Sequence, residues 1–121
     1  MERHAGSVTA LRRVARERGL AAEGFECDDA RAAVARWALA GVRLDAVVCD
    51  PPRAGLGVAA AGAARLAKRW LVLCSCRPEA LCADLRRIVG EGFAIEALSL
   101  FDMFPQTRHV EAVAWLERRH A

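Results

Sequence analysis

Hydrophobic and polar positions alternate along this chain with two distinct periods. Apolar residues at helical spacing predict four helices, over 7–18, 30–40, 58–68 and 78–89. Short apolar runs bounded by turn residues predict five strands, over 23–27, 44–49, 70–75, 93–100 and 110–116. The first helix is expected to place Val8 and Val14 inward opposite an arginine-rich face and to end at Gly19. Asp28 or Asp29 is expected to cap the second.

The order of these elements predicts an α/β domain with a mostly parallel sheet. The run 44–49, LDAVVC, is typical of a strand buried inside a parallel sheet. A loop without a helix joins the last two strands, so the final strand is expected to run antiparallel to the rest. Ligands of such sheets sit at the carboxyl ends of strands, where Asp50 and Cys76 stand.

Composition and charge narrow the class of protein. The 121 residues, 55% of them hydrophobic, suffice for one small domain with a core. There is no apolar run of membrane-spanning length and no signal-peptide pattern, and no metal site or membrane partner is expected. Five cysteines without a C-x-x-C pair indicate reduced thiols and a cytoplasmic location. A net charge of +3 permits an RNA partner without requiring one.

The segment Asp50-Pro51-Pro52-Arg53 follows a predicted strand. Two prolines make the turn stiff and aim its neighbours. A plain strand-ending turn is the simpler interpretation of a single Asp-Pro pair, but the doubled proline between Asp and Arg is more specific. Among methyltransferases a D/N-P-P motif holds a planar substrate at this place. Enzymes that methylate amino groups usually have an aromatic residue next, so Arg53 argues against that branch.

Cys76 lies between a predicted strand and a predicted helix that begins at Pro78. The positive end of the helix dipole and the neighbouring Arg77 both favour a thiolate there. Most isolated cysteines are simply small buried hydrophobes, and that interpretation is applied to the other four. Cys74 shares a strand face with Cys76, so alternation alone does not separate the two.

A dense loop of mixed side chains, DMFPQTRHVE at 102–111, separates the last two strands. Such a loop is uncommon as a mere connection. Glu111 is expected to open the final strand, and taken alone it reads as a solvated glutamate.

Together these motifs resemble the S-adenosylmethionine-dependent RNA uracil-5-methyltransferases that modify tRNA and 23S rRNA. DPPRAGL at 50–56, SC-x-P at 75–78 and DMFPQTRHVE at 102–111 follow that family's C-terminal motifs in order. The resemblance implies a Rossmann-like class I methyltransferase fold. No glycine-rich turn precedes Glu2, so residues 1–121 are expected to be the C-terminal portion of a catalytic domain without its first strand.

The resemblance also implies roles for individual residues. Cys76 is expected to be the nucleophile that adds to uracil C6, and Glu111 the base that removes the C5 proton. Asp50 and Arg53 are expected to hold the uridine, which must leave its stack in the RNA. The family usually has Asn where this chain has Arg77.

The implied cofactor is S-adenosylmethionine, with Glu2 at its ribose hydroxyls, Asp29 near its adenine and Asp50 contributing as well. Two alternatives stay open at this point. One is a non-catalytic α/β remnant. The other is a cysteine-dependent RNA cytosine-5-methyltransferase, but the loop motif with Glu111 favours the uracil-modifying family over this one.

Overall fold

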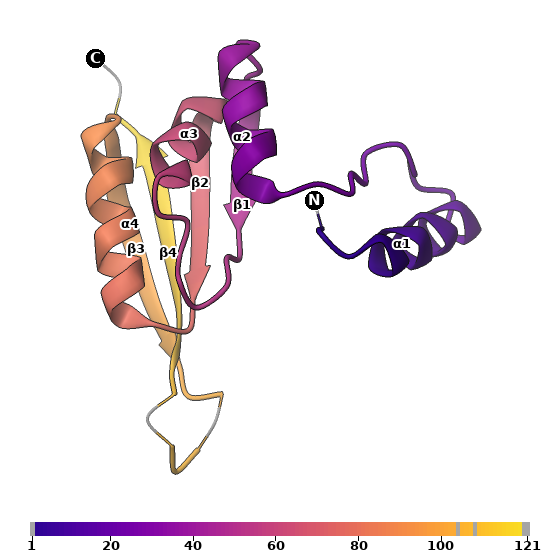
Figure 1. Ribbon diagram of the computed structural model, residues 1–121. Helices are drawn as coiled ribbons and strands as arrows, with labels where there is room; N and C mark the ends of the chain where they lie inside the picture. Colours follow the sequence, from indigo (N-terminus) through magenta and orange to yellow (C-terminus); the bar gives the residue numbers. More distant parts are fainter. Residues whose placement is uncertain (1, 104, 108, 120–121) are drawn as a thin grey trace.

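The computed structural model describes residues 2–103, 105–107 and 109–119, and these form a mixed α/β structure (Figure 1). The helices are α1 (Ala5–Glu17), α2 (Ala30–Leu39), α3 (Ala59–Leu66) and α4 (Pro78–Gly90). The strands are β1 (Leu44–Cys49), β2 (Ala67–Ser75), β3 (Phe93–Phe101) and β4 (Glu111–Arg118). All four predicted helices are confirmed, as is Asp29 as the N-cap of α2, where it accepts hydrogen bonds from two backbone N–H groups.

One four-stranded sheet organises the chain, with strand order β1-β2-β4-β3. β1 and β2 are parallel, whereas β4 is antiparallel to both of its neighbours, as the sequence predicts for the final strand. The carboxyl ends of β1 and β2 therefore lie at the same edge of the sheet as the start of β4 (Figure 1).

The core lies between the sheet and the helices α3 and α4, which cover one of its faces (Figure 1). Its largest fully buried side chains are Phe93, Leu66, Leu71, Leu73, Ile88 and Leu116. Helix α3 is rich in alanine, which lets it approach its neighbours closely. A Cβ at Gly62 would lie 2.8 Å from Cγ1 of Val34, so α2 and α3 pack at a distance that depends on this glycine.

Arg118 ties three elements together at the opposite end of the sheet. Its guanidinium donates hydrogen bonds to the backbone carbonyls of Ala64, Ala67, Lys68 and Glu91. It also stacks over the ring of Phe93, 4.4 Å from the centroid. The end of α3, the start of β2 and the turn before β3 are thereby held by one side chain.

The prediction of a strand over 23–27 is wrong. Residues 22–24 form a bend and turn, and Cys27 makes only an isolated parallel bridge to Glu2. A strand needs a continuous partner along its length, and Glu2 supplies a single point of pairing. The segment joins α1 to the rest of the chain at one side of the structure (Figure 1).

The prediction that 44–49 is buried on both faces is also wrong. β1 forms over those residues, but it is an edge strand paired only with β2, and much of it is exposed. Val47 and Cys49 pack against the core, whereas Val48, facing the other way, is 71% exposed. A run of β-branched residues thus fits the sheet without being covered on both sides.

Candidate active site

The turn after β2 is shaped by a buried serine. The Ser75 hydroxyl donates to the carbonyl oxygen of Arg77 at 3.1 Å and accepts the Arg77 backbone N–H at 3.2 Å. Arg77 is the N-cap of α4 and makes no side-chain cap hydrogen bond. Both bonds close on the backbone of Arg77, and they bend the chain at Cys76 directly before α4 begins.

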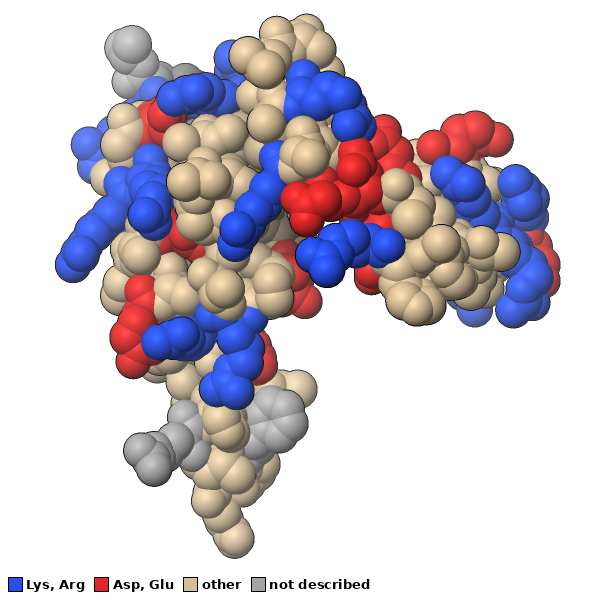
Figure 2. Space-filling view, viewed as in Figure 1, with Lys and Arg blue, Asp and Glu red and all other residues tan. Residues whose placement is uncertain are grey.

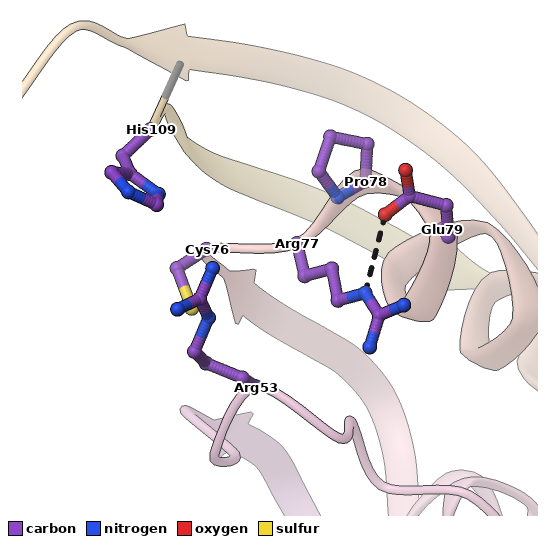
Figure 3. A pocket seen from close by; sticks show the side chains of 6 residues that line it. All are labelled: Arg53, Cys76, Arg77, Pro78, Glu79 and His109. Carbon is purple, nitrogen blue, oxygen red and sulfur yellow. Dashed lines mark hydrogen bonds and ion pairs between the residues drawn. The ribbon is translucent and has the colours of Figure 1, made fainter. Parts of the chain in front are cut away.

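Cys76 lies in the wall of a hollow of about 490 Å³ at this edge of the sheet. The hollow is lined by Arg53, Cys76, Arg77, Pro78, Glu79 and His109. Figure 3 shows side chains from three segments meeting there: Arg53 and His109 on either side of Cys76, and Arg77 turned toward Glu79. The Arg77 guanidinium pairs with the Glu79 carboxylate at 3.4 Å.

The loop after β1 brings Arg53 to this hollow. Asp50, exposed, follows the last residue of β1, and the double proline leads into a turn closed by the backbone hydrogen bond from Gly55 to Pro52 at 2.8 Å. Among the described residues, the Arg53 guanidinium makes no hydrogen bond or ion pair. Its five donors are thus open to a bound group.

The antiparallel pairing of β2 and β4 relates Cys76 to Glu111. Ser75 of β2 pairs with Ala112 of β4. Cys76 directly follows Ser75 in the sequence, and Glu111 directly precedes Ala112. The carboxylates of Asp50 and Glu111 both act on the neighbouring Cys74. Burial raises the pKa of the Cys74 thiol, and the negative charges of Asp50 and then Glu111 raise it further. The strand register places Glu111 across from the position that follows β2, and Asp50 directly follows the end of the neighbouring strand β1.

Cys49 is poorly suited to nucleophilic chemistry. Burial raises the pKa of Cys49 to about 11, with smaller contributions from Cys74 and Asp84. A thiol with so high a pKa stays protonated near neutral pH, and only the thiolate attacks. All five cysteines lie within the described residues and are free, as the sequence predicts. Cys27 and Cys82 are exposed, so the interpretation of these two as small buried hydrophobes is wrong.

Glu2 and Asp29, the predicted cofactor residues, do not line the hollow around Cys76. Asp29 Oδ1 is committed to capping α2, and its Oδ2 lies 3.6 Å from the Arg3 guanidinium. A hydrogen bond from the His4 backbone lowers the pKa of the Glu2 carboxyl, so Glu2 is ionised. Figure 2 shows a group of acidic side chains between the N-terminal segment and the rest of the structure. Glu2 and Asp29 both keep carboxylate oxygens that can accept hydrogen bonds from hydroxyls.

His109 and Glu79 line the hollow and were both missed by sequence reasoning. His109 lies in the loop between β3 and β4, two positions before Glu111, and its ring stands on the side of Cys76 opposite Arg53 (Figure 3). Its place in the DMFPQTRHVE motif was a usable signal. Phe104 and Arg108 of the same motif lie outside the described residues.

Two kinds of feature were sought across the described ranges. No helix there is long and apolar enough to cross a membrane. In the same part of the chain, no group of three or more His, Cys, Asp or Glu residues is gathered in a way that could hold a metal ion.

Comparison with known proteins identifies relatives over most of the chain. The profile of the family described as tRNA (uracil-5-)-methyltransferase matches residues 11–119. A 23S rRNA (uracil(1939)-C(5))-methyltransferase RlmD of Pseudomonas putida is 46% identical over 67% of this chain. An uncharacterized RNA methyltransferase of Lactiplantibacillus plantarum is 38% identical over 93% of it. The chain spans 18% and 25% of the lengths of these two relatives.

Solved structures share the fold. The Pyrococcus abyssi tRNA (uracil-54, C5)-methyltransferase, solved in complex with S-adenosyl-L-homocysteine, matches with a TM-score of 0.64 and 31% identity over 94% of this chain and 26% of its own. M1.HpyAVI, at 18% identity and a TM-score of 0.61 in its SAM complex, covers 78% of this chain and 52% of its own, and it supports the fold alone.

Proposed function

Because the chain belongs to the tRNA (uracil-5-)-methyltransferase family, we propose that it forms part of an enzyme that methylates C5 of a uridine in RNA. The observation that carries the proposal is the position of Cys76, which lies in the wall of an open hollow. Cys76 directly follows Ser75, and the partner of Ser75 on β4, Ala112, is directly preceded by Glu111. A nucleophile and a base close to one another are what this chemistry needs.

The proposed reaction begins at Cys76. Uracil C5 is too weak a nucleophile to take a methyl group unaided, so the Cys76 thiolate first adds to C6 and its electron pair forms a carbon–sulfur bond. The C5–C6 double bond opens toward an enolate. C5 then attacks the methyl carbon of a sulfonium, and the electron pair of the broken methyl–sulfur bond returns to that sulfur.

Glu111 completes the proposed cycle. Its carboxylate takes the proton from C5, the C5–C6 double bond re-forms, and the bond to Cys76 breaks with its electrons returning as thiolate. Glu111 opens β4 and is held between β2 and β3, because its neighbour Ala112 pairs with Ser75 and Glu111 itself pairs with Phe101. Its backbone is therefore fixed relative to Cys76.

The loop after β1 supplies the proposed contacts to the substrate. Asp50 is an exposed carboxylate that can accept hydrogen bonds from the N–H of a base, and Arg53 offers donors to carbonyl or phosphate oxygens. The hollow is open to solvent, so it fits a base turned out of its stack better than one inside a duplex.

The proposed cofactor is S-adenosylmethionine, which supplies the methyl group as a sulfonium. Glu2 and Asp29 are the residues proposed to accept hydrogen bonds from its ribose and adenine, with Asp50 nearer the reacting groups. These acceptors fit such a molecule, because carboxylate oxygens accept hydrogen bonds from hydroxyl and amino groups.

The test is methyl transfer from labelled S-adenosylmethionine to RNA, followed by nucleoside analysis. The proposal expects 5-methyluridine that is lost in Cys76→Ala. Label in 5-methylcytidine would instead indicate the cytosine-modifying alternative, and no transfer by a protein that binds the cofactor would contradict the proposal.

A further inference from the structure

A buried carboxylate on α4 holds the loop that follows β1. Asp84 is only 2% exposed. Its Oδ2 accepts the backbone N–H of Leu56 at 2.6 Å, and its Oδ1 accepts that of Gly57 at 2.9 Å. A carboxylate is costly to bury unless its oxygens are hydrogen-bonded, and here both are committed to amides of one loop.

The loop approaches α4 so closely that only glycine fits at position 55. Gly55 has φ +75°, a conformation that residues with a side chain rarely adopt. A Cβ on it would lie 2.5 Å from Oδ2 of Asp84 and 3.2 Å from Cβ of Ala80. Two independent features, the paired hydrogen bonds and the close glycine contact, therefore fix the loop against the same face of the helix.

The same helix also begins at the nucleophile. α4 starts at Pro78, directly after the turn that carries Cys76. Asp84 lies six residues further on, about 9 Å along the helix axis at the usual rise. The loop bound by Asp84 begins at Asp50 and carries Arg53 into the hollow beside Cys76 (Figure 3). One rigid element thus connects the two segments that build the hollow.

We infer that Asp84 is a positioning residue: it sets the loop of Asp50 and Arg53 in register with Cys76 for the reaction. The catalytic consequence rests on the proposed function. The attachment of the loop to Asp84, called the tether below, rests on the two hydrogen bonds and on the close approach of Gly55. The Arg87 guanidinium lies 3.6 Å from Oδ1 of Asp84 at the helix surface.

The tether is tested by amide hydrogen exchange in Asp84→Asn and Gly55→Ala. The asparagine keeps one acceptor and about the same volume, whereas the alanine displaces the loop with the carboxylate intact. In both, exchange at Leu56 and Gly57 is expected to accelerate about tenfold to a hundredfold, the range for losing a hydrogen bond to a charged group. Asp45→Asn, at an exposed carboxylate on β1, is the matched control. Wild-type exchange at both amides would overturn the tether.

The catalytic consequence is tested with two rates at Cys76. Alkylation by iodoacetamide, read by peptide mass, reports the thiol alone; covalent capture of RNA containing 5-fluorouridine reports the thiol together with the loop. The inference expects Asp84→Asn to slow capture about tenfold or more while alkylation keeps its wild-type rate. Equal changes in both rates would show a merely structural role and overturn the inference. If the wild-type enzyme of which this chain forms part captures no RNA, the proposed function fails, and the exchange rates still decide whether Asp84 holds the loop.

Discussion

Ser75, the last residue of β2, pairs with Ala112 of β4, so that Cys76, which follows Ser75, lies across from Glu111, which precedes Ala112. The pairing is antiparallel, so the chain after β2 and the chain before β4 leave the sheet at the same edge. Two residues that lie 35 positions apart in the sequence are thereby brought to one place, the edge where β1 also ends.

Replacing Cys76 by alanine is expected to abolish covalent capture of 5-fluorouridine RNA. Fluorine at C5 does not leave as a proton, so the adduct with the nucleophile should persist and be visible as a protein–RNA band on a denaturing gel. The matched control is Cys74→Ala, which removes the neighbouring thiol of β2 and should keep the band. A band that survives Cys76→Ala and disappears in Cys74→Ala would assign the nucleophile to Cys74.

Replacing Glu111 by glutamine is expected to separate addition from release. The amide has nearly the shape of the carboxylate but does not take the C5 proton, so adduct should accumulate on ordinary uridine RNA while turnover falls about a hundredfold or more. The measurement is the fraction of protein bound covalently to RNA during turnover. Glu117→Gln, on the same strand at its far end, is the control. Unchanged turnover would place the base elsewhere.

Stability is expected to fall at alkaline pH through Cys49. Burial raises the pKa of this thiol from its ordinary value of 9.0 to about 11. The folded state therefore favours the neutral thiol. The stability that this preference contributes is fully present below about pH 9 and is lost as the pH rises through about 11. At about pH 10.5 the loss is about 2 kcal/mol.

Urea unfolding at about pH 8 and about pH 10.5 measures this effect, and Cys49→Ala should lose less stability between the two. The chain has no tyrosine, so thiols dominate its titration in this range. An equal loss in the wild type and in Cys49→Ala would show that other groups cause the dependence.

Arg118→Ala is expected to lower the free energy of unfolding by about 2–4 kcal/mol. The change leaves several backbone carbonyls without their donor and removes the cation stacked on Phe93. Arg119→Ala, its exposed neighbour, should change stability by less than about 0.5 kcal/mol. Denaturant unfolding of the two variants provides the comparison, and similar values for both would rule out a special role for Arg118.

Periodicity in the sequence determined most elements of this protein, because local patterns of apolar residues and turn signals need no distant partner. The four helices, the antiparallel direction of β4, the cap at Asp29 and the start of α4 at Pro78 follow from residues close in sequence. The motifs likewise marked Cys76, Arg53 and Glu111, since Asp-Pro-Pro-Arg and the final loop are continuous segments.

Tertiary structure decided what depends on neighbours far along the chain. It placed β4 between β2 and β3 and left β1 as an exposed edge, although LDAVVC reads as a buried strand. It reduced 23–27 to a single bridge, because strand formation requires a partner along the whole length. It also brought His109 and Cys76 to the same hollow and fitted Asp84 against Gly55. Neither arrangement can be predicted from local sequence, because the segments involved are far apart along the chain.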